Sequence, residues 1–329
     1  MPDRMRWWGR STPEPAGGAQ LPPLIVVCGA TATGKTGLSL ELARSIPGAE
    51  IISADSRQVY RDMNIGTAKV TAAQRDLVPH HGLDLVDPDE PFTAADYQRA
   101  AISALEEIAA RGGLALLVGG TGLYLRAVAR GMVLDETGRD PAVRADLERR
   151  LVGEGLHVLV AQLRSAAPQV AARTDLANPR RVVRALERAA IHGDVPPPAP
   201  RGYPGPSVWI GLQVEPAQHR TWITARARAQ FESGLLEEAA ALRSRYDPNV
   251  PAFSAFGYQE AFAVLDGEVS VEQAVERDAT RTWQFARRQK TWFRAEPDIN
   301  WLDSESADVA EGAFGIITRE GMTARPSGR

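Results

Sequence analysis

The stretch "LIVVCGATATGKTGLSLELA" at residues 24–43 decides the fold class of this chain. It opens with an apolar run of the kind found in buried strands and closes with a segment of helical periodicity. Four positions between them fit the pattern G-x-x-x-x-G-K-[ST], namely Gly29, Gly34, Lys35 and Thr36. A strand, a glycine-rich loop and a helix in this order are typical of a loop that holds phosphate groups with its backbone amides.

We expect this loop to bind a compound with two or three linked phosphates. The predicted contacts are the eight loop residues Gly29, Ala30, Thr31, Ala32, Thr33, Gly34, Lys35 and Thr36. Lys35 would reach the distal phosphate, and the Thr36 hydroxyl would coordinate a metal ion. Mg²⁺ is therefore the expected cofactor.

The sequence lacks an acid that most phosphate-transferring enzymes with such a loop need. A nucleotide hydrolase or kinase usually carries a second metal-binding acid at the end of a later strand. The best candidate strand, "LALLVGG" at residues 114–120, is followed by Thr121 instead. We expect the loop to grip a pyrophosphate without hydrolysing a nucleotide. Two other interpretations stay open at this point, a small-molecule or nucleoside kinase that uses ATP and a non-catalytic RNA-binding NTPase switch.

Strand-like apolar runs alternate with helical segments, which predicts an α/β fold with a parallel sheet covered by helices. The expected strands are Leu24–Cys28, Glu50–Ser53, Leu114–Val118 and Val208–Val214. Residues 133–205 show helical segments without a convincing strand and end in a Pro/Gly-rich stretch. We therefore predict a P-loop-type core at residues 21–132 and 206–315, with a small helical domain inserted between its halves. Residues 1–20 are expected to be a disordered tail, and residues 316–329 a C-terminal tail.

Charge and cysteine usage exclude several classes of protein. The formal net charge of −3 means that a nucleic-acid partner would have to bind local basic patches. Cys28 is the only cysteine, which excludes an intrachain disulfide and a zinc site built from several thiolates. The adjacent His80 and His81 do not converge easily on a metal, so we expect loop or core residues. Without an apolar run of about 18 residues or a signal peptide, we expect a cytoplasmic protein with no membrane partner. A monomer is expected as well.

Asp55 follows the second expected strand, at the sheet edge where ligands bind. Taken alone, an Asp-Ser pair in this place is more often a turn or a cap. The segment around it, "ISADSRQVYRDMNIGTAK", favours a catalytic role because it closely resembles the bacterial tRNA dimethylallyltransferases. Further matching segments follow the family order up to about residue 302: "GATATGKT", "HHGLDLVDPDEPFTAADY", "LLVGGTGLYLRAV", "NPRRVVRALE", "FSAFGYQE" and "TRTWQFARRQKTWFR".

The resemblance implies that the loop holds dimethylallyl diphosphate, and that the prenyl group goes to N6 of the adenosine on the 3′ side of the tRNA anticodon. The family's catalytic aspartate corresponds to Asp55, and Thr121 and Arg226 match its diphosphate contacts. Outside the family, Arg226 would be interpreted as a solvated helix residue. An adenine amine is a poor nucleophile, so an acceptor that fixes it and takes its proton suits this reaction. Donors and cations aimed at the leaving diphosphate would lower the barrier.

The same resemblance predicts contacts with tRNA in several separate segments. They are Asp55, Ser56, Arg57, Gln58, Thr121, Arg144, Arg180, Arg181, Arg184, Ser254, Phe256, Gly257 and Tyr258. Without the family, the arginines of "NPRRVVRALERA" would be interpreted as a solvated basic helix face. The aromatic residues of the basic segment Thr280–Arg294 recur at helical spacing, which is more typical of a core than of base stacking. Where the family has "GYKE", Gln259 replaces the lysine and removes one basic group.

Overall fold

The structure is a computed structural model that describes residues 21–134 and 139–322. The tail predicted at residues 1–20 lies outside these ranges, as do residues 323–329. Within the described ranges, residues 132–201 form one compact unit, and the chain on either side of them forms the other. Each unit is therefore described by itself.

The larger unit, over its described residues, contains a six-stranded sheet in the order β3-β2-β4-β1-β5-β6. Its strands are β1 (Leu24–Gly29), β2 (Ala49–Ser53), β3 (His80–His81), β4 (Leu114–Gly119), β5 (Ser207–Gln213) and β6 (Ile299–Asp303). All neighbouring strands are parallel, which confirms the predicted α/β class. Val27 on the central strand β1 lies in register between Val118 and Ile210, so the phosphate loop leaves from the middle of the sheet.

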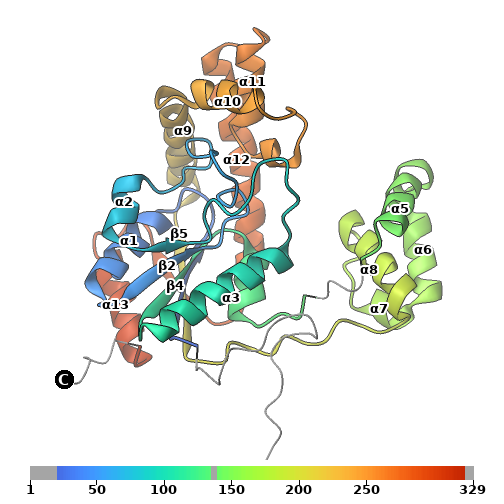
Figure 1. The fold of residues 1–329 in the computed structure, drawn as a ribbon, viewed down its shortest axis with the longest axis horizontal. Helices are drawn as coiled ribbons and strands as arrows, with labels where there is room; N and C mark the ends of the chain where they lie inside the picture. Colours follow the sequence, from blue (N-terminus) through green and yellow to red (C-terminus); the bar gives the residue numbers. More distant parts are fainter. Residues whose placement is uncertain (1–20, 135–138, 323–329) are drawn as a thin grey trace, which may run out of the picture. The chain divides into compact units, whose positions relative to one another are not determined.

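Helices cover both faces of this sheet (Figure 1). Because successive strand side chains point to opposite faces, Val26 packs in one buried cluster and Val27 in the other. The cluster around Val27 includes residues of α1 (Lys35–Ser45) and α13 (Val309–Arg319). The remaining helices of this unit are α2 (Ala72–Leu77), α3 (Ala94–Ala110), α4 (Gly122–Ala129), α9 (Pro216–Glu232), α10 (Leu235–Arg243), η2 (Pro251–Ser254), α11 (Tyr258–Leu265) and α12 (Val271–Arg294). Except for α2, they contribute to the cluster around Val26.

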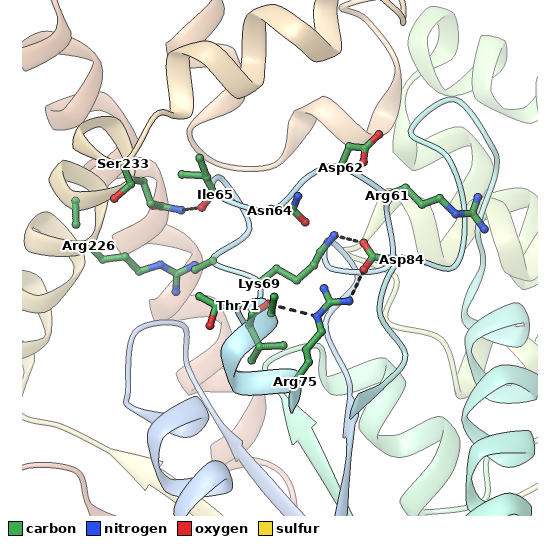
Figure 2. A pocket seen from close by; sticks show the side chains of 15 residues that line it. Arg61, Asp62, Asn64, Ile65, Lys69, Thr71, Arg75, Asp84, Arg226 and Ser233 are labelled. Atoms are coloured by element: carbon green, nitrogen blue, oxygen red, sulfur yellow. Dashed lines mark hydrogen bonds and ion pairs between the residues drawn. The ribbon is translucent and has the colours of Figure 1, made fainter. Parts of the chain in front are cut away.

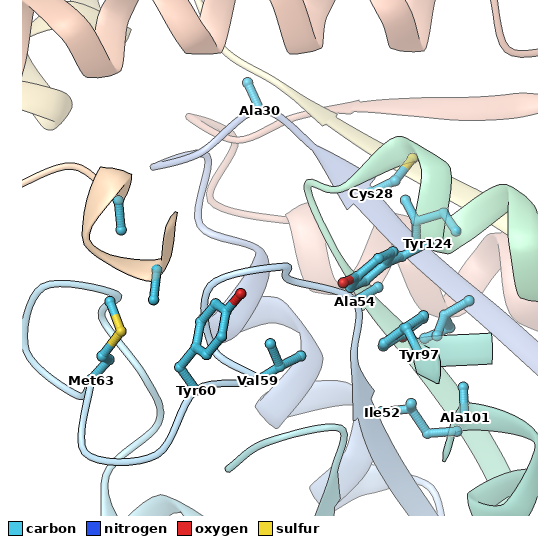
Figure 3. Packing of buried hydrophobic residues seen from close by; sticks show 14 of the residues in the cluster. Cys28, Ala30, Ile52, Ala54, Val59, Tyr60, Met63, Tyr97, Ala101 and Tyr124 are labelled. Atoms are coloured by element: carbon cyan, nitrogen blue, oxygen red, sulfur yellow. The ribbon is translucent and has the colours of Figure 1, made fainter. Parts of the chain in front are cut away.

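A pair of stacked tyrosines supports the end of β2. The rings of Tyr97 and Tyr124 lie 3.9 Å apart between centroids, and the Tyr97 hydroxyl donates to the Ser53 carbonyl oxygen at 2.9 Å (Figure 3). Cys28 lies in the same fully buried cluster, where burial raises the pKa of its thiol to about 12. The stacked tyrosines therefore support the end of β2, two residues before Asp55.

Two strands and part of the C-terminus depart from the sequence prediction. The two-residue strand β3 and the half-exposed edge strand β6 carry too short or too mixed an apolar pattern to be recognised. Residues assigned to a tail from 316 onward belong to the core, because Ile317 and Met322 are buried. The predicted insertion, residues 133–205, extends a few residues too far at its C-terminal end. The Gly202 amide donates to the Arg130 carbonyl oxygen and the Tyr203 hydroxyl to the Pro22 carbonyl oxygen, so both residues belong to the larger unit.

The inserted unit is helical over its described residues. It contains α5 (Pro141–Glu154), α6 (Leu156–Ala166), α7 (Pro168–Ala172) and α8 (Pro179–His192). Asp140 and Asn178 cap α5 and α8 by accepting hydrogen bonds from first-turn amides, and each helix begins with a proline. The helices bury a core of their own around residues such as Leu159, Leu163 and Val182. This unit therefore does not depend on the sheet for a hydrophobic core.

Candidate active site

The phosphate loop connects β1 to the first turn of α1. Gly34 has φ +82° and Ala32 has φ +58°, so two loop residues lie in the left-handed region. A side chain at Gly29 would meet the Leu212 carbonyl oxygen at 2.7 Å, which leaves room only for glycine. Lys35 Nζ donates to the Ala30 carbonyl oxygen at 2.5 Å, so the lysine folds back over its own loop. This backbone is the one that the motif predicts.

Arg226 and Asp55 both act electrostatically on the phosphate loop. Arg226 on α9 donates from Nη1 to the Thr31 hydroxyl at 2.9 Å. Desolvation, helped by the charge of Arg226 and opposed by that of Asp55, lowers the pKa of Lys35 to about 8. Burial likewise lowers the pKa of Arg226, with Asp55 again opposing. Two cations and one carboxylate thus converge here, and an incoming anion would stabilise both cations.

The lowered pKa of Lys35 predicts a pH-dependent affinity for a diphosphate. A bound anion raises the pKa of the ammonium, so binding takes up a proton above pH 8. Affinity should fall by up to about tenfold per pH unit above pH 8 and change little through Lys35 below it. Calorimetric titrations with dimethylallyl diphosphate between pH 7 and pH 9.5 measure the affinity at each pH. Repeating them in two buffers of different ionisation enthalpy measures the number of protons taken up on binding.

Lys35→Arg is the matched control because it keeps a positive charge throughout this range. Its affinity should stay level between pH 8 and pH 9.5. A level profile in the unsubstituted protein, with no proton uptake, would contradict the assignment of Lys35 to the diphosphate.

Asp55 and Thr121 meet at the carboxyl ends of two neighbouring strands. Ser53 on β2 is in register with Val118 on β4, and the Thr121 amide donates to the Ala54 carbonyl oxygen at 3.2 Å. The Thr121 hydroxyl oxygen accepts from the Ser56 amide at 3.1 Å. Asp55 Oδ1 accepts from the Arg57 amide at 2.8 Å. Since β4 lies between β2 and β1, Thr121 follows the strand next to the one that carries the phosphate loop, and Asp55 follows the next strand beyond it.

The structure brings two of the predicted tRNA-contact segments together although they are about 200 residues apart. Arg57 donates from Nη1 to the Pro251 carbonyl oxygen and from Nη2 to the Ser254 hydroxyl, both at 3.0 Å. The side-chain amide of Gln58 accepts a hydrogen bond from the Ser53 hydroxyl and donates one to the Thr67 carbonyl oxygen. Both segments therefore belong to one surface beside Asp55.

The aromatic residues of this region divide into a half-exposed pair and a buried one. Phe256 and Phe285 are half-buried with their ring centroids 5.2 Å apart, and the guanidinium of Arg281 lies over Phe256. Tyr258 is fully buried, and its hydroxyl donates to Glu238 at 2.7 Å. Burial does not fit the direct tRNA contact predicted for Tyr258, and Gly257 beside it is buried too.

Arg226 also lines a cavity of about 790 Å³ (Figure 2). On its wall, Lys69 Nζ and Arg75 Nη1 both donate to Asp84, at 2.6 and 2.8 Å. One carboxylate against two cations leaves this wall with net positive charge. The sequence did not predict this cavity, because its walls come from two segments far apart in the chain, residues 61–84 and α9.

The predicted tRNA contacts of the inserted unit have different environments. Arg180 and Arg181 at the start of α8 are exposed. Arg184 instead donates to the buried carboxylate of Glu187 at 2.8 Å, and Arg144 approaches that carboxylate at 3.8 Å. Arg180 and Arg181 are thus exposed to a partner, with Arg181 also paired to the exposed Asp175 at 3.4 Å, whereas the other two compensate a buried charge.

Two buried residues that sequence analysis did not single out contact the phosphate loop. They are His219 on α9 and Gln289 on α12, and both form hydrogen bonds with Thr31. Gln289 lies within the family-like segment "TRTWQFARRQKTWFR", but nothing in that pattern distinguishes it from its neighbours, and His219 lies in none of the matching segments.

The family described as IPP transferase matches residues 58–296 of this chain. The chain belongs to the IPP transferase family. The tRNA dimethylallyltransferase of Roseiflexus castenholzii is 45% identical over 303 residues, which cover 90% of this chain and 97% of the relative. A tRNA dimethylallyltransferase of Anaeromyxobacter is 43% identical over 85% of this chain and 92% of its own length.

Solved structures of the family share the fold. A tRNA isopentenylpyrophosphate transferase from Bacillus halodurans is 37% identical, with a TM-score of 0.67 over 91% of this chain and 98% of its own. A eukaryotic dimethylallyltransferase, described as acting on tRNA, is 25% identical, with a TM-score of 0.74 over 93% of this chain and 80% of its own. Membership confirms the resemblance stated from the sequence, and the kinase interpretation is not favoured. No helix within residues 21–134 and 139–322 is long and apolar enough to cross a membrane.

Proposed function

We propose that this chain transfers the dimethylallyl group of dimethylallyl diphosphate to N6 of the adenosine 3′-adjacent to the tRNA anticodon, releasing diphosphate. The proposal rests on one arrangement. A carboxylate, a threonine hydroxyl and a phosphate loop follow the ends of three consecutive strands of the sheet, and β4 ends at Gly119 and is followed by Gly120 and Thr121 without the metal-binding acid of a kinase. The names of the relatives agree with it. We further propose that the protein acts as a cytoplasmic monomer.

The proposed reaction is a single displacement at the first carbon of the prenyl group. The N6 lone pair forms the new C–N bond as the C–O bond to the diphosphate breaks, and the diphosphate leaves with the bonding electrons. Asp55 accepts the N6 proton, which becomes acidic as the nitrogen bonds to carbon. Lys35, Arg226 and the loop amides stabilise the negative charge that develops on the leaving group.

Mg²⁺ fits the donor set of the phosphate loop. Thr36 stands in the first turn of α1 with its side chain exposed. Mg²⁺ usually takes one or two protein oxygens and completes its coordination with phosphate oxygens and water. Thr36 would supply the protein oxygen and the diphosphate the others. When bound, the ion would neutralise charge on the leaving group.

A transfer assay tests the proposed function. The protein is incubated with radiolabelled dimethylallyl diphosphate, unmodified tRNA and Mg²⁺, while ATP hydrolysis is followed in a parallel reaction. We expect label in tRNA at N6 of that adenosine and no ATP turnover. ATP turnover without labelled tRNA would overturn the proposal.

The exposed start of α8 is proposed to bind RNA phosphates. Each phosphate that a protein cation neutralises contributes about −0.7 to −0.9 to the slope of log affinity against log salt. Arg180→Ala combined with Arg181→Ala should therefore weaken tRNA binding and flatten this slope by up to about 1.8. Affinity for dimethylallyl diphosphate should not change. Filter binding over a salt series measures the slope.

The control removes two other exposed arginines of the inserted unit, Arg149 and Arg164. Arg184 is kept in both variants, because its loss would leave the buried Glu187 carboxylate poorly compensated. An unchanged salt slope in the folded Arg180/Arg181 variant would place the RNA contact elsewhere, with the basic segment Thr280–Arg294 as the next candidate.

A further inference from the structure

Gln289 connects the phosphate loop to the turn that carries Thr121. Its side-chain Oε1 accepts from the Thr31 amide at 2.8 Å, and its Nε2 donates to the Gly120 carbonyl oxygen at 2.8 Å. The side chain is buried, and the two bonds use both ends of one amide group. A single residue of α12 thus joins the strand ends of β1 and β4.

The turn is built to admit this amide. A side chain at Gly120 would lie 2.4 Å from Gln289 Nε2 and 3.3 Å from the Gly29 carbonyl oxygen. A larger residue here would displace the glutamine amide from between the two strand ends. The next residue, Thr121, holds the Ser56 amide beside Asp55, so a shift of Gly120 would be passed directly to the catalytic pair.

Thr31 is held on three sides by helices that follow the inserted unit in the chain. Besides the bond from its amide to Gln289, its carbonyl oxygen accepts from His219 Nε2 at 2.8 Å and its hydroxyl accepts from Arg226 at 2.9 Å. Burial lowers the pKa of His219, so the ring stays a neutral donor. The next residue, Ala32, adopts a left-handed conformation that costs a non-glycine residue energy. The contacts at Thr31 hold the loop in this shape before any ligand arrives.

We propose that Gln289 is a positioning residue that sets the separation between the bound diphosphate and the acceptor side of the site, at Asp55 and Thr121. The inference rests on the proposed prenyl transfer. Reacting groups must be held within about 3–3.5 Å of each other, and a misplacement of about 1 Å costs about 10²-fold in rate. Only an amide side chain of this length can accept from Thr31 and donate to Gly120 at once. Gln289 acts through these backbone groups without touching the substrate.

The test replaces Gln289 by methionine, which keeps its length and removes both hydrogen-bonding groups. Under single-turnover conditions with both substrates saturating, we expect transfer to slow by at least about tenfold. This is less than the roughly 10²-fold loss expected for a full misplacement of about 1 Å. The dissociation constant for tRNA should change by less than about twofold. Gln284→Met, an exposed glutamine on the same helix, is the matched control and should transfer at the wild-type rate.

A second comparison separates positioning from a general loss of stability. If Gln289 acts through the Gly120–Thr121 turn, Gln289→Met and Thr121→Val together should cost less than the product of their separate effects. Fully multiplied effects would contradict the proposed route. Should Gln289→Met fail to fold, Gln289→Asn replaces it, because its shorter amide cannot reach both Thr31 and Gly120.

The outcomes distinguish this inference from the function on which it rests. If the wild-type protein labels no tRNA, the proposed function fails. If the wild-type protein labels tRNA and the folded Gln289 variant does so at the same single-turnover rate, the function stands and the positioning role is refuted.

Discussion

Asp55→Asn is expected to bind both substrates and to transfer the prenyl group about 10²–10⁴-fold more slowly, the range that general-base help contributes. The asparagine oxygen can still accept from the Arg57 amide, as Asp55 Oδ1 does at 2.8 Å, so the segment should keep its shape. An amide nitrogen cannot take the N6 proton. Single-turnover transfer to unmodified tRNA, with both substrates saturating, isolates this step.

Asp76→Asn is the matched control, because Asp76 is an exposed aspartate on α2. Its rate should equal that of the wild-type protein. If Asp55→Asn transfers within tenfold of wild type while binding both substrates, Asp55 is not the base. The proton would then have to leave N6 by another route.

Lys35→Ala should cause the second-largest loss, and it should act on the donor. A hydrogen bond to a charged group contributes about 1.5–3 kcal/mol, so affinity for dimethylallyl diphosphate should fall by roughly 10–150-fold. Charge also develops on the diphosphate during reaction, so the saturated rate should fall further, by up to about 10²–10³. Affinity for tRNA should not change. Calorimetry for the donor and filter binding for tRNA separate these effects.

Arg44→Ala provides the comparison, because Arg44 is an exposed cation in the last turn of the same helix, α1. It should leave donor affinity unchanged, which excludes a general loss of positive charge as the cause. Wild-type donor affinity in Lys35→Ala would reduce the glycine-rich loop to a structural turn.

The phosphate loop could be predicted from the sequence because its eight residues are contiguous and lie between a strand and a helix. The partners of Thr31 could not, since His219 and Gln289 stand 188 and 258 residues away on the helices α9 and α12. A buried amide on a helix has no spacing signature, whereas a glycine-rich loop has one. The strands beside the site could also be predicted from the sequence, because β1 and β4 are fully buried apolar runs and β2 is fully buried around Ile51 and Ile52.

Family motifs predicted which segments belong to the site better than which side chains face a partner. "SAFGYQ" lies beside Arg57, which donates to Ser254, but Tyr258 within it is buried and its hydroxyl donates to Glu238. In the inserted unit, Arg180 and Arg184 are four residues apart on one helix, yet only the first is exposed, because Glu187 holds the other. Burial and ion pairing depend on neighbouring helices, and a one-dimensional pattern does not contain them.

Cys28 gives this protein a practical property. Its thiol is the only one in the chain, is buried below the phosphate loop, and has a pKa raised to about 12 by burial. Because thiolates are the reactive form, maleimide dyes should leave it unmodified near neutral pH. Cysteines introduced at exposed Ser165 on α6 and exposed Glu41 on α1 would therefore carry the only fluorophores. Energy transfer between them would report whether tRNA binding changes the distance between the inserted unit and the sheet, with every native residue of the site in place.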